Sequence, residues 1–187
     1  MNRPNRRTPE LLNPRTAEPD LELTAPGEPS EPSFERSKIT GADYANLVAW
    51  YVARRFESRG LKVYREVRVG KTIIAKNRCI DILCVGDSGQ KAFAIECKYQ
   101  DSQGTVDEKI PYALDDLQAL PMAGCIAYAG TGFSPGVLHM LAASPHAAFC
   151  LPVIAQIEST NETRELDHLL AMHFGWWDVL TERRKPI

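Results

Sequence analysis

The sequence lacks several features that would assign it to common classes of protein. Its apolar runs are far shorter than the roughly 18 residues that a membrane span needs, and no apolar stretch follows the charged N-terminus as it would in a secretory signal. Its five cysteines form no CxxC pair, and their odd number argues against a zinc site and against a disulfide framework. Most of them lie in apolar runs, which is typical of small buried residues in a reducing compartment. We therefore expect a cytoplasmic protein with no membrane partner.

Two other motifs are also missing. The four histidines are scattered, and His168 and His173 are five residues apart, whereas two zinc ligands on one helix face are four apart. The stretch Gly130-Thr131-Gly132 lacks the GK[ST] ending of a phosphate loop, so it is interpreted as a turn after a strand.

The composition indicates one globular domain with an extension. Of the 187 residues, 44% are hydrophobic and 25% are charged, an ordinary balance for a soluble domain. Residues 1–37 hold more than half of the thirteen prolines and show no hydrophobic period. They are predicted to be a disordered tail, followed by a domain over residues 38–187.

The charge is unevenly distributed along the chain. The net charge of −2 argues weakly against a nucleic-acid partner, but nine basic residues lie between Arg54 and Arg78. Only Glu57 and Glu66 oppose them, so this segment carries a charge of +7 (nine minus two). It is either a solvated surface or a phosphate-facing patch beside an active site, in which Lys76 and Arg78 would contact nucleic acid.

Hydrophobic periodicity predicts the order helix, three strands, helix, strand, followed by further elements. Three consecutive strands suggest an antiparallel meander, and a helix before the fourth strand suggests a crossover to parallel pairing. The fold class is therefore α/β, a central mixed sheet flanked by helices on both faces. The predicted helices are 41–59, 107–120, 134–143 and 165–174, and the predicted strands are 61–69, 78–85, 92–99, 125–129 and 149–154.

Charged residues interrupt two of the predicted strands. Strand side chains alternate between faces, so Glu96 and Lys98 share one face of the third strand. The apolar residues between them point to the other face, and so do Ile80 and Ile82 on the second strand. Asp81 is then left to share the face of Glu96, because the turn at residues 87–89 makes the two strands neighbours.

Such a cluster requires compensation for its charge. Burying these groups without partners costs several kcal/mol, and two adjacent carboxylates repel each other. Mg²⁺ relieves both penalties, since it prefers one or two carboxylates together with water and phosphate oxygens. The alternative is a simple ion pair between the acids and Lys98 on an exposed sheet face.

The sequence Asp81 followed by Glu96-Cys97-Lys98 resembles the signature of the PD-(D/E)XK nuclease superfamily, over roughly residues 40 to 130. The resemblance implies a restriction endonuclease-like core of the order αβββαβ. It also implies that Asp81, Glu96 and the main-chain carbonyl of Cys97 bind Mg²⁺, with Mn²⁺ as a substitute, and that Lys98 assists the attacking water. Asp81 follows Ile80, where the family pattern has proline.

The resemblance also suggests further positions. Many members carry a further acid on the first helix, for which this sequence offers Asp43, or Glu66 on the first strand. Gln100 continues the face of the catalytic strand and is a candidate for contacting a phosphate or a bound water. Thr105 and Lys109, around a helix N-terminus, are candidates for binding the nucleic-acid backbone.

We expect an Mg²⁺-dependent DNA endonuclease of the restriction, repair or recombination type, with a homodimer or a partner subunit supplying specificity. Because the first helix offers no glutamate, one alternative is a catalytically weak or inactive nuclease-fold protein that acts as a DNA-binding module. A second alternative is a structural or interaction protein whose glutamate and lysine form only an ion pair.

Overall fold

The computed structural model describes residues 39–102, 104–154, 156–182 and 184–185, so the tail predicted over residues 1–37 lies outside the described residues. In chain order the elements are α1 (Gly41–Arg55), a 3₁₀ turn η1 (Glu57–Arg59), β1 (Lys62–Lys71), β2 (Asn77–Val85), β3 (Ala92–Tyr99), α2 (Val106–Gln118), β4 (Ala123–Ala129), α3 (Pro135–Ala143), β5 (Ala147–Phe149), α4 (Arg164–Phe174) and α5 (Trp177–Thr181).

The five strands form one mixed sheet in the order β1-β2-β3-β4-β5. The pairs β1/β2 and β2/β3 are antiparallel, whereas β3/β4 and β4/β5 are parallel. Helix α2 provides the crossover from β3 to β4, because parallel neighbours cannot be joined by a tight turn. The predicted αβββαβ core and its mixed sheet are therefore confirmed.

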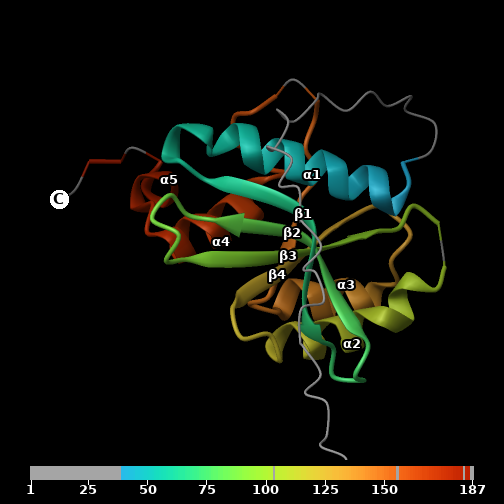
Figure 1. Ribbon diagram of the computed structural model, residues 1–187. Coiled ribbons are helices and arrows are strands. Elements are labelled where there is room, and N and C mark those ends of the chain that lie inside the picture. Colours follow the sequence, from blue (N-terminus) through green and yellow to red (C-terminus); the bar gives the residue numbers. More distant parts are fainter. Residues whose placement is uncertain (1–38, 103, 155, 183, 186–187) are drawn as a thin grey trace, which may run out of the picture.

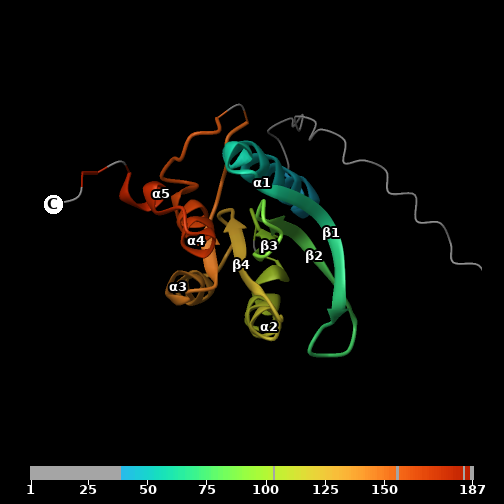
Figure 2. The ribbon, with the colours of Figure 1, turned by 60° about the vertical axis from the view of Figure 1, so that its left-hand side comes forward.

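Helices cover both faces of the sheet (Figures 1 and 2). Helices α1 and α4 pack on one face, where Tyr51 and Leu170 are fully buried in the same core as Ile95 of β3. Helices α2 and α3 pack on the other face, where Ile110 and Leu141 lie in a second core. The sheet is therefore buried between two helical layers. No helix within the described ranges is long and apolar enough to cross a membrane.

Helix α1 shows how local sequence sets an element's bounds. Thr40 and Asp43 form a capping box at its start, in which each side chain accepts a hydrogen bond from the other residue's backbone N–H. The α-helix ends at Arg55 and not at residue 59 as predicted. The fully buried Phe56 is followed by a 3₁₀ turn, and Gly60, at φ +70°, reverses the chain into β1.

The prediction of the fifth strand over residues 149–154 is wrong for most of its length, because β5 ends at Phe149. Beyond it, Cys150 still donates to the carbonyl of Tyr128, but Leu151 donates to Glu162 outside the sheet, and Pro152 has no N–H to donate. An apolar run that leaves the sheet looks the same in sequence as a strand.

Candidate active site

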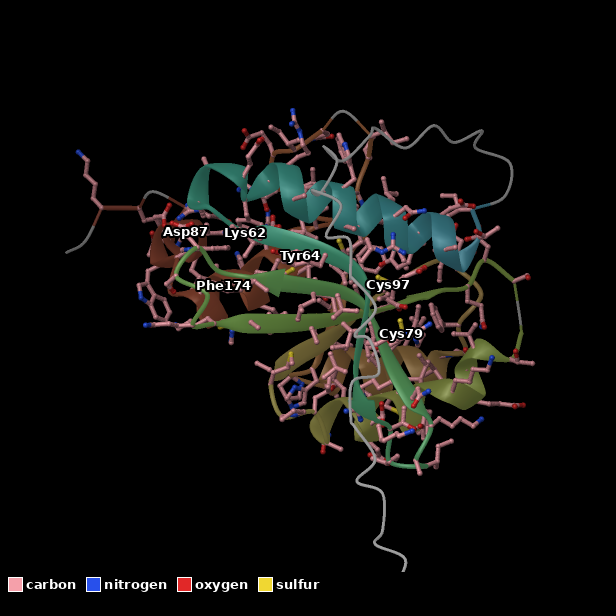
Figure 3. All side chains as sticks on the ribbon, in the orientation of Figure 1. Lys62, Tyr64, Cys79, Asp87, Cys97 and Phe174 are labelled. Carbon is pink, nitrogen blue, oxygen red and sulfur yellow. The ribbon has the colours of Figure 1, made fainter. Side chains whose placement is uncertain are left out.

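The site lies where β2 and β3 separate. Their ladder runs from Val85↔Ala92 only as far as Ile82↔Ile95, although β3 continues to Tyr99 and stays paired with β4 over that length. Beyond this point Asp81 and the end of β3 face a gap between the strands. Cys79 and Cys97, labelled in Figure 3, belong to the separating stretches of β2 and β3.

Asp81 is held at this gap from two directions. Its carboxylate accepts a hydrogen bond of 2.8 Å from the backbone N–H of Cys97, in place of the missing ladder partner. Its main-chain carbonyl accepts one of 2.9 Å from Nε of Arg65, which also donates to the side chain of Asn46 on α1. In a sheet the N–H and C=O of one residue point to the same neighbouring strand, so the Cys97 carbonyl faces the same gap as Asp81.

The separation of the strands also corrects one expectation. Ile82 packs with Ile95 on the α1 side, as predicted, but Ile80 is buried in the core beneath α2. On the side of Ile82 away from the turn between the two strands, β2 is no longer paired with β3. Its side chains there do not all point to the faces that strict alternation predicts. The carboxylate of Asp81 therefore reaches β3 at a fork in the sheet, through the N–H of Cys97, which is next to Glu96 in the chain.

Glu96 and Lys98 project from β3 on the α2 side, with Nζ of Lys98 3.4 Å from a carboxylate oxygen of Glu96 and each side chain only 22% exposed. Burial raises the pKa of Glu96 to about 7; Lys98 opposes the shift, and the nearby carboxylates of Asp81 and Asp116 add to it. One ammonium group does not compensate the two carboxylates of Asp81 and Glu96. The site therefore favours an additional cation.

These two side chains open into a cavity of about 460 Å³. One wall is the β1–β2 hairpin, the other is α2, and Glu96 and Lys98 lie between them. Lys109 of α2 lines the cavity as well and is a second lysine in it. The remaining lining residues are Thr72, Asn77, Arg78, Cys79, Tyr112, Ala113, Asp116, Leu117 and Leu120.

Neither candidate for an additional acid lies in this cavity. Asp43 is exposed and engaged in the α1 capping box, and its hydrogen bonds with Thr40 lower its pKa. Glu66 has φ +54°, and its side chain is 76% exposed and within 4.0 Å of Arg65. Within the described part of the chain, no three His, Cys, Asp or Glu side chains are grouped as a metal site. The side-chain ligands that fit a cation here are the two carboxylates of Asp81 and Glu96.

Gln100 is buried, and its side chain is occupied by protein contacts. Its amide nitrogen donates to Asp107 at 2.9 Å and to the carbonyl of Gly132 at 2.7 Å, while its oxygen accepts from the N–H of Val106 at 3.1 Å. A Cβ at Gly130 would lie 2.2 Å from the Gln100 carbonyl, so this turn after β4 requires glycine. Gln100 thus ties the end of β3 to the start of α2.

The predicted nucleic-acid contacts separate into two groups. Lys76 is exposed at the hairpin, Lys109 is exposed in the cavity wall, and Thr105 is exposed just before α2. Arg78 is 95% buried instead, and its guanidinium donates at 2.7 and 3.0 Å to the carboxylate of Asp116. Sequence reasoning missed Asp116 as the partner of Arg78. The signal for it in the sequence is its position on α2, four residues after Tyr112, at the border of the helix face that points inward.

The basic segment is not one continuous patch. Arg54, Arg55 and Arg59 form ion pairs with Glu57, Glu158 and Asp178, respectively, at the α1 end of the molecule. These three arginines fit the interpretation as a surface of ion pairs. Among the basic residues of this segment, those closest to the cavity belong to the β1–β2 hairpin.

Comparisons with known proteins give one family match and two similar solved structures. Residues 40–177 match the model of the PD-(D/E)XK nuclease superfamily domain. Among solved structures, a protein of unknown function is similar at 20% identity and a TM-score of 0.34, covering 49% of this chain and 50% of its own. A repair endonuclease from Pyrococcus abyssi is similar at 18% identity and a TM-score of 0.34, covering 58% of this chain and 45% of its own.

The chain thus spans about half the length of each of these two structures. The comparison with curated proteins finds no match. The family match covers the fork, the cavity and both helical layers, and it includes Asp81, Glu96 and Lys98. The chain therefore belongs to the PD-(D/E)XK nuclease superfamily.

Proposed function

We propose that this chain is a metal-dependent endonuclease that hydrolyses phosphodiester bonds in DNA, with Mg²⁺ as its ion and Mn²⁺ as a substitute. The observation that carries the proposal is the position of three residues at the fork: Glu96 and Lys98 line the cavity together with Lys109, and the carboxylate of Asp81 is bound to the neighbouring backbone N–H of Cys97. Two carboxylates with incomplete compensation beside an ammonium group suit a divalent cation and a phosphate.

Each residue has a distinct role in this proposal. The carboxylates of Asp81 and Glu96 and the carbonyl of Cys97 would hold the ion. When bound, the ion supplies Lewis-acid polarisation of the scissile phosphate and of the attacking water. Lys98 donates hydrogen bonds to the incoming water or to a phosphoryl oxygen as negative charge develops there. The water oxygen would form the new bond to phosphorus while the bond to the leaving sugar oxygen breaks; the water loses a proton to bulk solvent, and the leaving oxygen takes one up from solvent.

The surrounding groups position these side chains. The hydrogen bond from the Cys97 N–H fixes the Asp81 carboxylate, and the Arg65 guanidinium fixes its backbone. Gln100, which the sequence suggested as a direct phosphate contact, is better assigned to positioning, because three protein groups occupy its amide. Lys109 and Thr105, with Lys76 at the hairpin, remain proposed contacts for the nucleic-acid backbone.

A plasmid-nicking assay tests the proposal. Purified protein should nick DNA with Mg²⁺ or Mn²⁺ and not with EDTA, and Lys98→Ala should reduce the rate at least about a hundredfold with the fold intact. Lys62→Ala is the matched control, since Lys62 is an exposed lysine at the far end of β1. Full activity of the Lys98 variant would contradict the proposed role of this lysine.

The second candidate is a nuclease-fold module that binds DNA without cutting it. It is favoured by the position of Asp43 in a helix cap, which leaves two side-chain carboxylates at the fork. Tight DNA binding without nicking in either metal would support this candidate.

We also propose that a second copy or a partner subunit supplies sequence specificity and the second cut of a double-strand break, since one chain provides one such site. All five cysteines are free, which supports the expectation of a reducing, cytoplasmic setting.

A further inference from the structure

The connection between β1 and β2, residues 71–77, displays an apolar pair at its end. Ile73 is 50% exposed and Ile74 is 55% exposed. Two adjacent β-branched apolar side chains exposed to this extent gain little from folding, and such a patch is often an interaction site. We call residues 71–77 the hairpin tip.

The hairpin tip is held in place by hydrogen bonds. The N–H of Thr72 donates to the carbonyl of Lys76 at 2.8 Å, and the N–H of Ala75 donates to Thr72 at 2.9 Å. The N–H of Ile73 donates to the carboxylate of Asp116 on α2, also at 2.8 Å. The isoleucines are therefore presented on a fixed backbone that is anchored to α2.

The charge around the hairpin tip has one sign. From residue 67 to residue 80 the sequence contains Arg68, Lys71, Lys76 and Arg78 and no acid. Arg78 is neutralised by Asp116, and the other three cations are exposed. The apolar pair lies between two of these cations, Lys71 and Lys76. A polyanion with apolar surface near its charges is the complementary partner.

The hairpin tip also adjoins the cavity of the active site. Thr72 and Asn77, at its two ends, line the same cavity as Glu96 and Lys98. Figures 1 and 2 show the connection between β1 and β2 projecting beside α2, past the end of the sheet. A nucleic-acid strand whose phosphate lies at Lys98 would therefore continue past Thr72 and reach the isoleucines.

We propose that the hairpin tip is a wedge for duplex nucleic acid. Ile73 and Ile74 enter a groove and press between neighbouring base pairs, while Lys71 and Lys76 contact the phosphates on either side. Apolar side chains inserted between base steps from the minor groove partly unstack them and kink the duplex toward the major groove, while neighbouring cations contact the backbone. This inference rests on the proposed function only for its location beside the cleavage site, and it assigns a duplex as the substrate class.

The test measures binding without cleavage. A short fluorescent duplex that carries 2-aminopurine is titrated with the full chain in Ca²⁺, and anisotropy and base unstacking are read together. Ile73→Ser/Ile74→Ser should bind the duplex about tenfold more weakly, because two apolar side chains no longer leave water, and the unstacking signal should disappear. The salt dependence of its affinity should stay unchanged, since no cation is removed.

Val153→Ser/Ile157→Ser is the matched control, because Val153 is 55% exposed and Ile157 is 41% exposed in a different region of the surface. It should bind and unstack the duplex as the wild type does. Lys71→Ala/Lys76→Ala should lower the salt slope of binding by about two.

Three outcomes would overturn the wedge. One is unchanged affinity and unstacking in the isoleucine variant. Another is equal weakening in the Val153/Ile157 control. The third is an isoleucine variant that no longer binds vesicles of anionic phospholipid but keeps its affinity for the duplex. That result would assign the hairpin tip to a membrane surface. Because binding is measured without hydrolysis, an absence of nicking would contradict the proposed function and leave this test intact.

Discussion

Two carboxylates line the same cavity, that of Asp116 from α2 and that of Glu96 from β3, and their surroundings shift their pKa values in opposite directions. Burial raises the pKa of Asp116 as well, but hydrogen bonds from Arg78 and from the N–H of Ile73 outweigh it and hold the pKa below its ordinary value. For Glu96, burial raises the pKa to about 7; Lys98, with its Nζ at 3.4 Å, opposes the shift, and the carboxylates of Asp81 and Asp116 add to it.

The difference separates a structural group from a functional one. The Arg78–Asp116 pair is complete within the protein, with three hydrogen bonds between the two residues. The fold alone leaves the carboxylate of Glu96 with too little positive charge around it. Carboxylates whose charge the protein does not compensate are typical of sites that bind or react with another molecule. Substitutions around Asp116 should therefore lower stability, whereas substitution of Glu96 should raise stability and lower activity.

The largest effect on stability is expected at the Asp116 wall. Arg78→Met should lower the free energy of unfolding by about 3–5 kcal/mol, because it leaves the carboxylate of Asp116 largely buried without its partner. Chemical denaturation measures this loss. The double variant Arg78→Met/Asp116→Leu should recover most of it, since no unpaired charge remains. A single variant as stable as the wild type would show that the pair does not hold the hairpin to α2.

A smaller effect of opposite sign is expected at Glu96. Its folded-state pKa of about 7 lies above the ordinary 4.5, so the folded state binds the proton more tightly than the unfolded state does. The contribution to stability is complete below pH 4.5 and is lost as the pH rises through 7. At about 1.4 kcal/mol per pH unit, the loss amounts to at most about 3 kcal/mol.

Glu96→Gln should remove this pH dependence. Without added metal, the variant should be more stable than the wild type at pH 8 and similar to it at pH 4.5, while its nicking activity is lost. Denaturation midpoints at several pH values in EDTA measure the first effect, and the plasmid assay measures the second. Parallel stability curves for the two proteins would mean that Glu96 is adequately compensated in the folded state.

The surroundings of Glu96 and of Asp116 also differ in how much of them could be predicted from the sequence. Strand alternation placed Glu96 and Lys98 together, because it is a local rule, and the motif spacing added Asp81. The fork that brings Asp81 to Cys97 was not predictable, since the end of a ladder depends on where β2 leaves β3. The interpretation of Arg78 as a phosphate contact missed Asp116, because that pair joins residues 38 positions apart.

Gln100 and the fifth strand illustrate the same limit. Strand β3 ends at Tyr99, one residue before Gln100, and the hydrogen bonds to Asp107 and Gly132 that occupy the Gln100 amide come from later segments. The apolar run likewise could not tell β5 from the irregular segment that follows Phe149. Local patterns predicted the elements and the face of the site, whereas tertiary contacts decided which polar groups remain available there.

The smallest effect sharpens the comparison at a third acid. Asp43 was a candidate for the additional acid of the active site, yet its carboxylate accepts from Thr40 N–H at 3.0 Å as part of the α1 cap. If capping is its role, Asp43→Ala should lower the melting temperature slightly and leave the nicking rate and the Mn²⁺ affinity unchanged. Thermal unfolding, nicking and calorimetric titration with Mn²⁺ measure the three quantities. Weaker Mn²⁺ binding in this variant would instead place Asp43 with Asp81 and Glu96, and α1 would then have to supply a ligand to the fork.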